Sequence, residues 1–353
     1  MPDVIFNHIE ISGISACIPS QVKLNMDYQW IAKDKRKQLI DLTGIEQRHV
    51  APPGIHASDM CRTAAEKLLQ DLNISPKDIG IMLFVSQSRD YYLPHTSAIL
   101  QHTLGLSQQC LVSDISMGCS GYVYGLSFIS SLLEHSDAKY GLLLAGDVST
   151  RSTSYMDKST YPLFGDAGTA TIVKKTDKPV KSQFSYGNDG SRFESIIIRN
   201  GMSKHHSPRS GFRKRKISQG IYRSKMDLEL NGPEIFHFAI TDVPVHIKSL
   251  MKKTGLEAND IDFFILHQAN RLMLETIGKI LKVPKEKIPI HLDRYGNTSS
   301  ASIPLCMVTE IQEQLRNRKL RLLLSGFGVG LSMGSAVIET NCIHISDLQY
   351  IDA

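Results

Sequence analysis

The sequence predicts a layered α/β fold built from two related halves. Four pairs of segments recur in the same order at offsets close to 180 residues, and the strands among them are continuous apolar runs. Such strands belong to sheets covered on both faces, so we expect helices on either side of each sheet. A length of 353 residues with 42% apolar residues suits a chain that buries its core in two units. We place the halves at 1–178 and 179–353.

In the first half the expected order is helix, strand, strand-to-helix crossing, strand, strand. Residues 61–72 have a helical pattern, and 75–87 hold an apolar strand opened by Asp-Ile. β-Forming residues stop at 117–118, and small and apolar residues then recur at helical spacing. A helix is therefore expected to begin at Cys119. The two strands that close the half are expected at 140–147 and 167–173.

The second half repeats this order. A helical pattern at 245–256 precedes an apolar run within 257–269, again opened by Asp-Ile. The offset of 180 residues from Cys119 reaches Ser299, in "GNTSS", where we expect the matching helix to open. The closing strands are expected at 320–327 and 333–339. Cys119, His267 and Asn297 then all fall at strand or helix ends, where α/β folds place their binding sites.

Cys119 can be read in two ways. The first N–H groups of a helix lack internal partners and the helix dipole is positive there, which lowers a thiol pKa and favours a nucleophile. Cysteine is also a common buried residue that only fills space. Taken alone, His267 is equally a structural histidine and Asn297 a turn or cap residue.

Composition excludes several classes of protein. The N-terminal residues lack the basic and apolar regions of a signal peptide, and the apolar run 322–338 is short and interrupted by glycine. The six cysteines are scattered, without metal-ligand spacing or a disulfide framework. We therefore expect no metal, no membrane span and a reducing, cytoplasmic location.

Six motifs together resemble the β-ketoacyl-acyl-carrier-protein synthase III family of thiolase-fold condensing enzymes. The resemblance runs nearly end to end and implies a thiolase-like fold with α-β-α-β-α layers. The motifs are "LTGIEQRHVA" (42–51), "GCSGY" (118–122), "LFGDAGTA" (163–170), "LHQAN" (266–270), "DRYGNTSSAS" (293–302) and "GFGVGLSMGSA" (326–336).

The resemblance also implies roles for individual residues. Cys119 would be the nucleophile that carries the acyl group. His267 and Asn297 would hold the oxygen of a malonyl thioester as decarboxylation makes it an enolate. The backbone N–H groups of Cys119 and Val329 would form the oxyanion hole, and Leu93 would close the acyl pocket of a partner in a homodimer. A loop leucine that packs within its own subunit is an equally good reading of Leu93.

The resemblance implies acyl-CoA or acyl-carrier phosphopantetheine thioesters as substrates, with no permanently bound cofactor. Gln38 and Leu42 stand where the family has the tryptophan and arginine of its coenzyme A clamp. Val329 replaces a glycine, and Arg271 follows "HQAN" one place early. These departures favour a specialised member, in secondary metabolism or acylated-glycan assembly, over the primer of fatty acid synthesis.

One segment is strongly basic. Residues 199–225 contain nine lysines and arginines and no acidic residue, while the whole chain has a net charge of +5. We expect this segment, densest at Arg213, Lys214, Arg215 and Lys216 and assisted by Arg271, to attract an acidic acyl carrier protein.

Two other functions stay open. Cys119 could pass its acyl group to a hydroxyl or amine without decarboxylation. The basic segment could instead bind nucleic acid, although no aromatic platform or nucleic-acid motif accompanies it.

Overall fold

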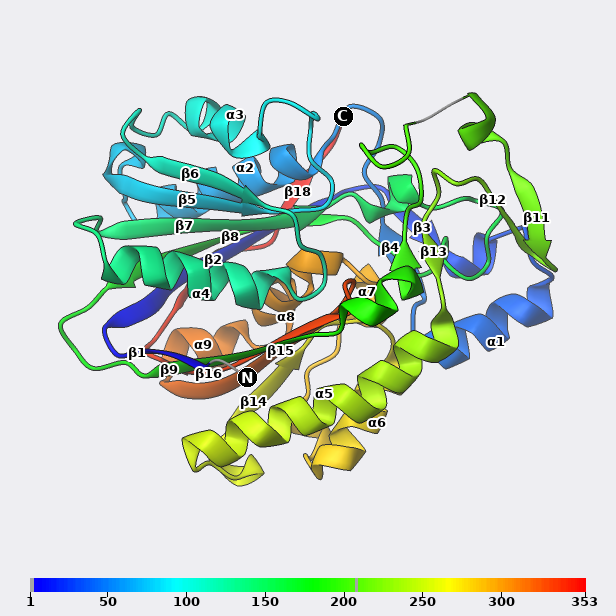
Figure 1. The fold of residues 1–353 in the computed structure, drawn as a ribbon. Helices are drawn as coiled ribbons and strands as arrows, with labels where there is room; N and C mark the ends of the chain where they lie inside the picture. Colours follow the sequence, from blue (N-terminus) through cyan, green and yellow to red (C-terminus); the bar gives the residue numbers. More distant parts are fainter. Residues whose placement is uncertain (1–2, 207–208) are drawn as a thin grey trace.

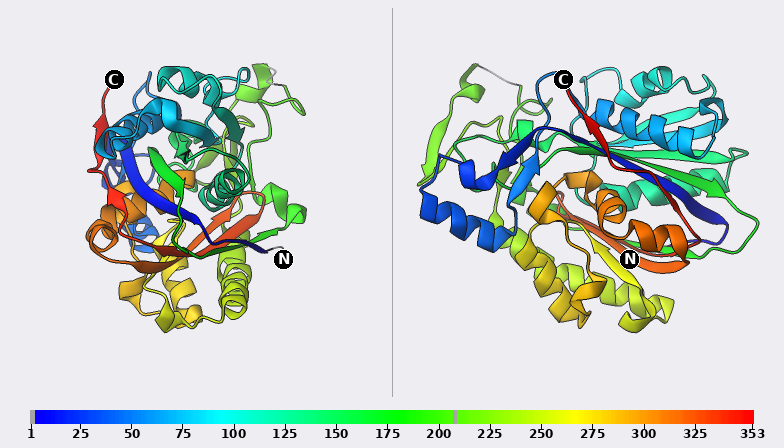
Figure 2. Two further views of the ribbon diagram at one scale, coloured as in Figure 1. Left: turned by 90° about the vertical axis from the view of Figure 1, so that its left-hand side faces the viewer. Right: turned by 180° about the vertical axis from the view of Figure 1, so that it is seen from behind.

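The computed structural model describes residues 3–206 and 209–353, and it has five layers: helices, sheet, helices, sheet, helices (Figure 1). The end-on and rear views show the same stacking (Figure 2). The predicted α-β-α-β-α arrangement is therefore confirmed.

The first sheet has the strand order β17-β2-β8-β7-β5-β6, and β18 also pairs with β2. Its strands are β2 (Ile9–Pro19), β5 (Ile79–Val85), β6 (Leu111–Ile115), β7 (Tyr140–Asp147), β8 (Ala167–Lys175), β17 (His344–Ile345) and β18 (Gln349–Ile351). β5 runs parallel to β6 and β7, and β7 runs antiparallel to β8.

The second sheet has the order β1-β9-β16-β15-β14. Its strands are β1 (Asp3–Phe6), β9 (Ser182–Asn188), β14 (Phe263–Leu266), β15 (Leu320–Gly328) and β16 (Ser332–Thr340). β14 is parallel to β15 and β15 antiparallel to β16, which repeats the β5-β7-β8 arrangement. The terminal strands cross between the halves, because β1 joins the second sheet and β17 and β18 join the first. The division at residue 178 stays a prediction.

Helices fill the three remaining layers. α2 (Ala57–Asp71) and α3 (Thr96–Thr103) cover the outer face of the first sheet, and α5 (Gly232–Thr254) and α6 (Arg271–Leu281) cover that of the second (Figure 1). Between the sheets lie α4 (Gly121–Glu134), α8 (Ser302–Glu310) and α9 (Gln312–Asn317). Each interface between layers has its own apolar cluster, and the central one packs α4 and α8 against both sheets.

The smaller elements lie beside the layers. They are α1 (Lys33–Thr43), α7 (Leu292–Tyr295), β3 (Val22–Leu24), β4 (Gln47–His49), β10 (Ile196–Ile197), β11 (Arg215–Ser218), β12 (Ile221–Arg223) and β13 (Glu229–Leu230). No helix among the described residues is both long and apolar enough to cross a membrane.

Most predicted elements are present, with one local difference. The helix expected to open at Ser299 begins as a single 3-10 turn, Ser299–Ala301, and becomes α-helical at Ser302. Ser299 has a φ of 53°, which an α-helix cannot contain. The backbone thus reaches α8 through a left-handed residue, and that residue lies in the catalytic cavity described next.

Candidate active site

The three residues predicted to be catalytic line one cavity of about 500 Å³. It opens where β5, β6, β7, β14 and β15 end, so the loops after five strands contribute to its wall. Cys119 comes from the start of α4, His267 from the end of β14, and Asn297 from the turn before α8. The shared position of strand ends in the two halves is what brings these distant residues together.

Glycines allow the start of α4 to sit tightly against its neighbours. A side chain at Gly121 would come within 2.5 Å of Val85 in β5, so this end of α4 can approach the sheet only without one. On the other side, a Cβ at Gly326 would lie 2.7 Å from the carbonyl oxygen of Cys119, and one at Gly328 would lie 2.9 Å from its sulfur. Close packing from both sides fixes the position of the thiol.

The protonation of Cys119 differs from our expectation. Burial raises the pKa of its thiol to about 12, and the nearby Asp147 carboxyl raises that pKa further. The backbone N–H groups of Val329 and Cys119 and the side chain of Ser299 act in the opposite direction as hydrogen-bond partners. The predicted pKa-lowering by the helix terminus is therefore wrong for the free enzyme: burial outweighs it. Nucleophilic attack requires a group that accepts the thiol proton.

The same two N–H groups, of Cys119 and Val329, are the predicted oxyanion hole. Both lie close enough to the Cys119 sulfur to favour its charged form. The position of Val329 depends on its backbone alone, so the change from glycine leaves the donor in place. The role of these groups in holding an oxyanion stays a prediction.

His267 is held as a neutral donor. Its backbone N–H donates to the Ser325 carbonyl at 2.8 Å, and its ring lies edge-on to Phe327 with the ring centres 5.6 Å apart. Nδ1 is 2.7 Å from the hydroxyl of Ser302, the first residue of α8. Burial lowers the pKa of His267 to about 3, so the ring is uncharged at neutral pH. With the Ser302 hydroxyl donating to Nδ1, Nε2 carries the proton and can donate it to a ligand.

Asn297 also presents a donor. Its backbone N–H donates to the Leu163 carbonyl at 2.9 Å, and its carbonyl accepts from the Gly165 N–H at 3.0 Å. Its side-chain Oδ1 accepts the Ser299 N–H at 2.9 Å. Because that oxygen is occupied, Nδ2 is the atom left for a ligand. This bridge to 163–165 explains why the "LFGDAGTA" segment, interpreted as structural, accompanies the catalytic motifs.

A buried arginine supports the same bridge. Arg48 is 1% exposed, and its guanidinium donates to the carbonyls of Tyr161 at 2.8 Å and Phe164 at 3.0 Å. It also stacks on the Tyr161 ring. The motif at 42–51 thus contributes a fastening for the loop that holds Asn297.

Sequence reasoning missed two polar members of the site. Asp147, the last residue of β7, lines the cavity and is 1% exposed. Ser299 was identified only as the position that mirrors Cys119, and its side chain also lines the cavity. A charged residue that ends an otherwise apolar strand, as in "YGLLLAGD", is the signal that could have indicated Asp147.

The mouth of the cavity is apolar. Leu42 is 60% exposed there, and further lining comes from β10, β13 and the starts of α5 and α6. Gln38 does not line the cavity, and its side chain accepts from Lys35. Trp30 donates to the Gly220 carbonyl at 3.1 Å and lies against Tyr222, so it anchors the β11–β12 hairpin. Neither residue supplies an aromatic clamp at the mouth.

The remaining predicted residues lie outside the cavity wall. Leu93 is 79% exposed and does not line the cavity of its own chain. Arg271 starts α6 and packs against Gly44, beside the mouth. Arg213 and Lys214 precede β11, Arg215 and Lys216 begin it, and all four are exposed on the hairpin (Figure 1).

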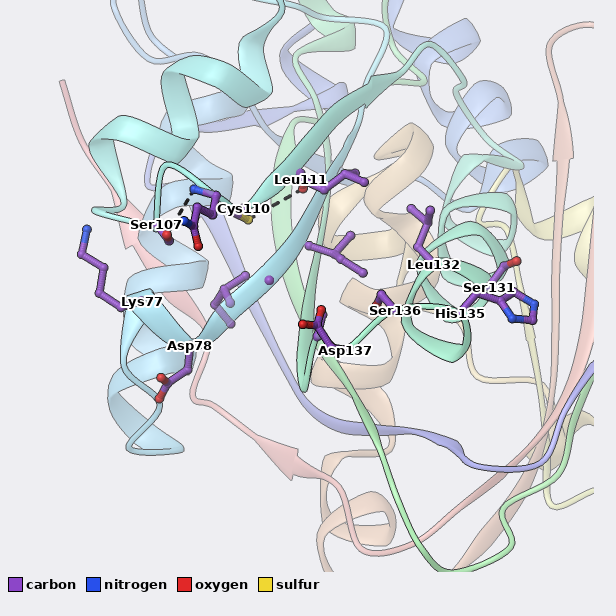
Figure 3. Close-up of a pocket in the computed structure, with 15 residues that line it drawn as sticks. Lys77, Asp78, Ser107, Cys110, Leu111, Ser131, Leu132, His135, Ser136 and Asp137 are labelled. Atoms are coloured by element: carbon purple, nitrogen blue, oxygen red, sulfur yellow. Dashed lines mark hydrogen bonds between the residues drawn. The ribbon is translucent and has the colours of Figure 1, made fainter.

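A second cavity, of about 510 Å³, lies at the opposite ends of β5 and β6 (Figure 3). Its lining includes Lys77, Asp78, Cys110, His135 and Asp137. The close-up shows these side chains spread around the cavity, without convergence on one point. No cluster of potential metal ligands occurs among the residues that the structure describes.

The fold and the cavity define a thiol-dependent acyltransferase. Residues 113–190 match the family model for 3-oxoacyl-[acyl-carrier-protein (ACP)] synthase III, and 251–340 match the model for its C-terminal part. The β-ketoacyl-[acyl-carrier-protein] synthase III of Geobacillus kaustophilus is 30% identical over 331 residues, covering 93% of this chain and 98% of the relative. That of Lactococcus lactis is 29% identical, covering 94% and 98%.

Solved structures agree. A 3-oxoacyl-(acyl-carrier protein) synthase from Burkholderia xenovorans superposes with a TM-score of 0.93 at 32% identity, covering 99% of both chains. The priming β-ketosynthase of the R1128 polyketide pathway shares the fold, with a TM-score of 0.81 at 23% identity, over 95% of this chain and 97% of its own. The chain belongs to the β-ketoacyl-[acyl-carrier-protein] synthase III family, whose members are condensing acyltransferases.

Proposed function

We propose that the protein loads an acyl group on Cys119 and then condenses it with a malonyl or related thioester. In the first step the Cys119 sulfur bonds to the acyl carbon and the donor thiol leaves. In the second, a malonyl thioester loses carbon dioxide, and its carbanion attacks the acyl carbon and releases Cys119. The observation that supports this is the presence of two neutral donors, on His267 and Asn297, in the cavity that holds the thiol.

The protonation of His267 favours condensation over simple acyl transfer. Transfer to a hydroxyl or amine needs a base that takes the acceptor's proton. The pKa of His267, about 3, makes it a poor base, whereas its Nε2–H suits an enolate oxygen. Release of carbon dioxide from a malonyl thioester distinguishes the two reactions, and acyl transfer without that release would support the alternative.

We further propose a carrier protein as the source of the acyl group. The mouth offers the aliphatic Leu42 where the family has an arginine, and Gln38 and Trp30 are engaged elsewhere. A carrier protein brings its own contacts to the surface outside the mouth, so it depends less on a nucleotide clamp. No bound cofactor is needed for either step.

A homodimer is proposed on the state of β6 and Leu93. β6 is an edge strand of the first sheet, paired only with β5 among the described strands, and its Leu111 is 47% exposed. Unpaired edges attract a further strand. Leu93 projects from the same side of the sheet, in the loop between β5 and α3, where a partner could receive it. The cytoplasmic location stays a prediction of the cysteine pattern.

The basic hairpin is the proposed docking surface for the acidic carrier. Reversing the charges of Arg213, Lys214, Arg215 and Lys216 should raise the apparent KM for carrier-bound substrate several-fold. These side chains are exposed, so they act mainly on association, within a screening length of about 8 Å at physiological salt. Initial rates against carrier concentration, at several salt concentrations, measure the effect.

A short pantetheine thioester is the control substrate, because it lacks the acidic protein. Its turnover should barely change in the charge-reversed variant, and the variant's KM for carrier should respond to salt much less than that of the wild type. Equal loss with both substrates would mean that the hairpin only supports the fold. Salt-sensitive binding of bulk RNA with no effect on carrier kinetics would favour the nucleic-acid alternative.

A further inference from the structure

The Asp147 carboxyl is fixed at the wall of the catalytic cavity by four donors. Oδ1 accepts the Gln87 N–H at 2.8 Å and the Ser86 hydroxyl at 3.2 Å. Oδ2 accepts the Ser300 hydroxyl at 2.7 Å and the Ser300 N–H at 3.2 Å. No lysine, arginine or histidine among the described residues forms an ion pair with it. A buried carboxyl held only by donors is suited to be an anion that can take a proton.

Ser299 lies between this carboxyl and the nucleophile. Its side chain acts as a hydrogen-bond partner of both the Cys119 thiol and the Asp147 carboxyl. A hydroxyl accepts one proton donor while it donates to another group, so the path from sulfur to carboxyl is continuous. All three residues line the cavity.

The backbone holds Ser299 in an unusual conformation. Its φ of 53° lies in the left-handed region that favours glycine, and its N–H is tied to Asn297 Oδ1 at 2.9 Å. Side chains other than glycine persist in this region mainly where the surroundings force them, often at functional sites. The strained turn keeps the hydroxyl of Ser299 directed at the thiol and ties it to Asn297.

The loading step lacks another base. Among the described residues that line the cavity, Arg89, Cys119, Asp147 and His267 are the ionisable ones. Arg89 is a cation, and His267 is a weak base whose Nδ1 is engaged by Ser302. Burial raises the pKa of Asp147 and so makes its carboxylate a stronger base than an exposed aspartate. The titratable groups that face Asp147 are the thiols of Cys61 and Cys119.

We propose that Ser299 and Asp147 form the proton relay for the loading of Cys119, an inference that rests on the proposed function. The thiol proton passes to the Ser299 oxygen as the Ser299 proton passes to Asp147. The sulfur bonds to the acyl carbon, and the bond from that carbon to the donor sulfur breaks. The departing thiolate then regains the proton from Asp147 through Ser299. Ser299 contacts the reacting sulfur, Asp147 acts through it, and His267 and Asn297 remain for condensation.

The test is single-turnover acylation of Ser299→Ala, followed by intact-protein mass spectrometry. We expect loading with a pantetheine thioester at pH 7 to slow by about a hundredfold, which is the usual contribution of general base catalysis. Because the thiol pKa is raised, the thiolate fraction grows tenfold per pH unit below that pKa. Loading of the variant should therefore recover about tenfold per unit from pH 7 to 9, while the wild type changes little.

Ser300→Ala is the matched control. It removes a donor to the same carboxyl but leaves the path from Cys119 through Ser299 intact. It should load at a rate within a few-fold of the wild type, with no recovery at high pH. Asp147→Asn should resemble Ser299→Ala, and the double variant should be no slower than either single one, because both changes break one path.

Condensation separates a relay from a general disturbance of the site. Ser299→Ala that has been acylated by long incubation should release carbon dioxide and product within a few-fold of the wild-type rate. Loading at the wild-type rate, or a loss that pH does not restore, would overturn the relay. If the wild type accepts no acyl group from any thioester, the proposed function fails instead.

Discussion

Cys119→Ala is expected to abolish both acyl-enzyme formation and condensation. Cys17, Cys61, Cys110 and Cys306 are buried and do not line the cavity. Burial raises the pKa of each of these four thiols, which suppresses their reactivity. Without Cys119 there is no sulfur within reach of the donors on His267 and Asn297. Removal of a covalent nucleophile is the largest single loss that this mechanism allows.

Intact-protein mass spectrometry after incubation with a panel of acyl thioesters measures the result. The wild type should gain the mass of one acyl group, and that mass identifies the preferred chain. Cys342→Ala is the matched control, because Cys342 is the exposed thiol and should be acylated, if at all, only nonspecifically. Persistent stoichiometric acylation of Cys119→Ala would refute the assignment of the nucleophile.

His267→Ala and Asn297→Ala should still accept an acyl group on Cys119 but lose decarboxylation. Each variant removes one of the two donors available to an enolate oxygen: Nε2–H of His267 or Nδ2–H of Asn297. A donor of this kind contributes on the order of a hundredfold. The defect should therefore appear in the second half-reaction and leave the first nearly intact.

Carbon dioxide release from labelled malonyl thioester, measured on pre-acylated enzyme, tests each donor. His135→Ala and Asn317→Ala remove a histidine and an asparagine that are exposed and far from the cavity lining, so they should behave as wild type. Thermal unfolding should accompany the assay, because Asn297 also ties the turn at Ser299. A folded variant that releases carbon dioxide at the wild-type rate would show that its residue has another role.

The sequence carries enough information to predict the repeated architecture. Strand pairs β5-β7 and β14-β15 were predictable, because apolar runs with matching flanks recur at one offset and are read directly along the chain. The exchange of β1, β17 and β18 between the sheets was not. These strands are short, and their partners lie more than 150 residues away or at the other end of the chain. Short strands carry little periodic signal of their own.

The sequence by itself determined which residue types stand at the ends of the corresponding strands: a thiol in one half, an imidazole and an amide in the other. Only the tertiary structure decided their protonation. The helix terminus predicted a lowered pKa for Cys119, but atoms from β5, β15 and the turn at Ser299 bury the thiol and raise that pKa. Likewise, Asp147 became visible only when β7 was placed against the turn that holds Ser299 and Ser300. Desolvation depends on neighbours that are distant along the chain, so no local pattern can report it.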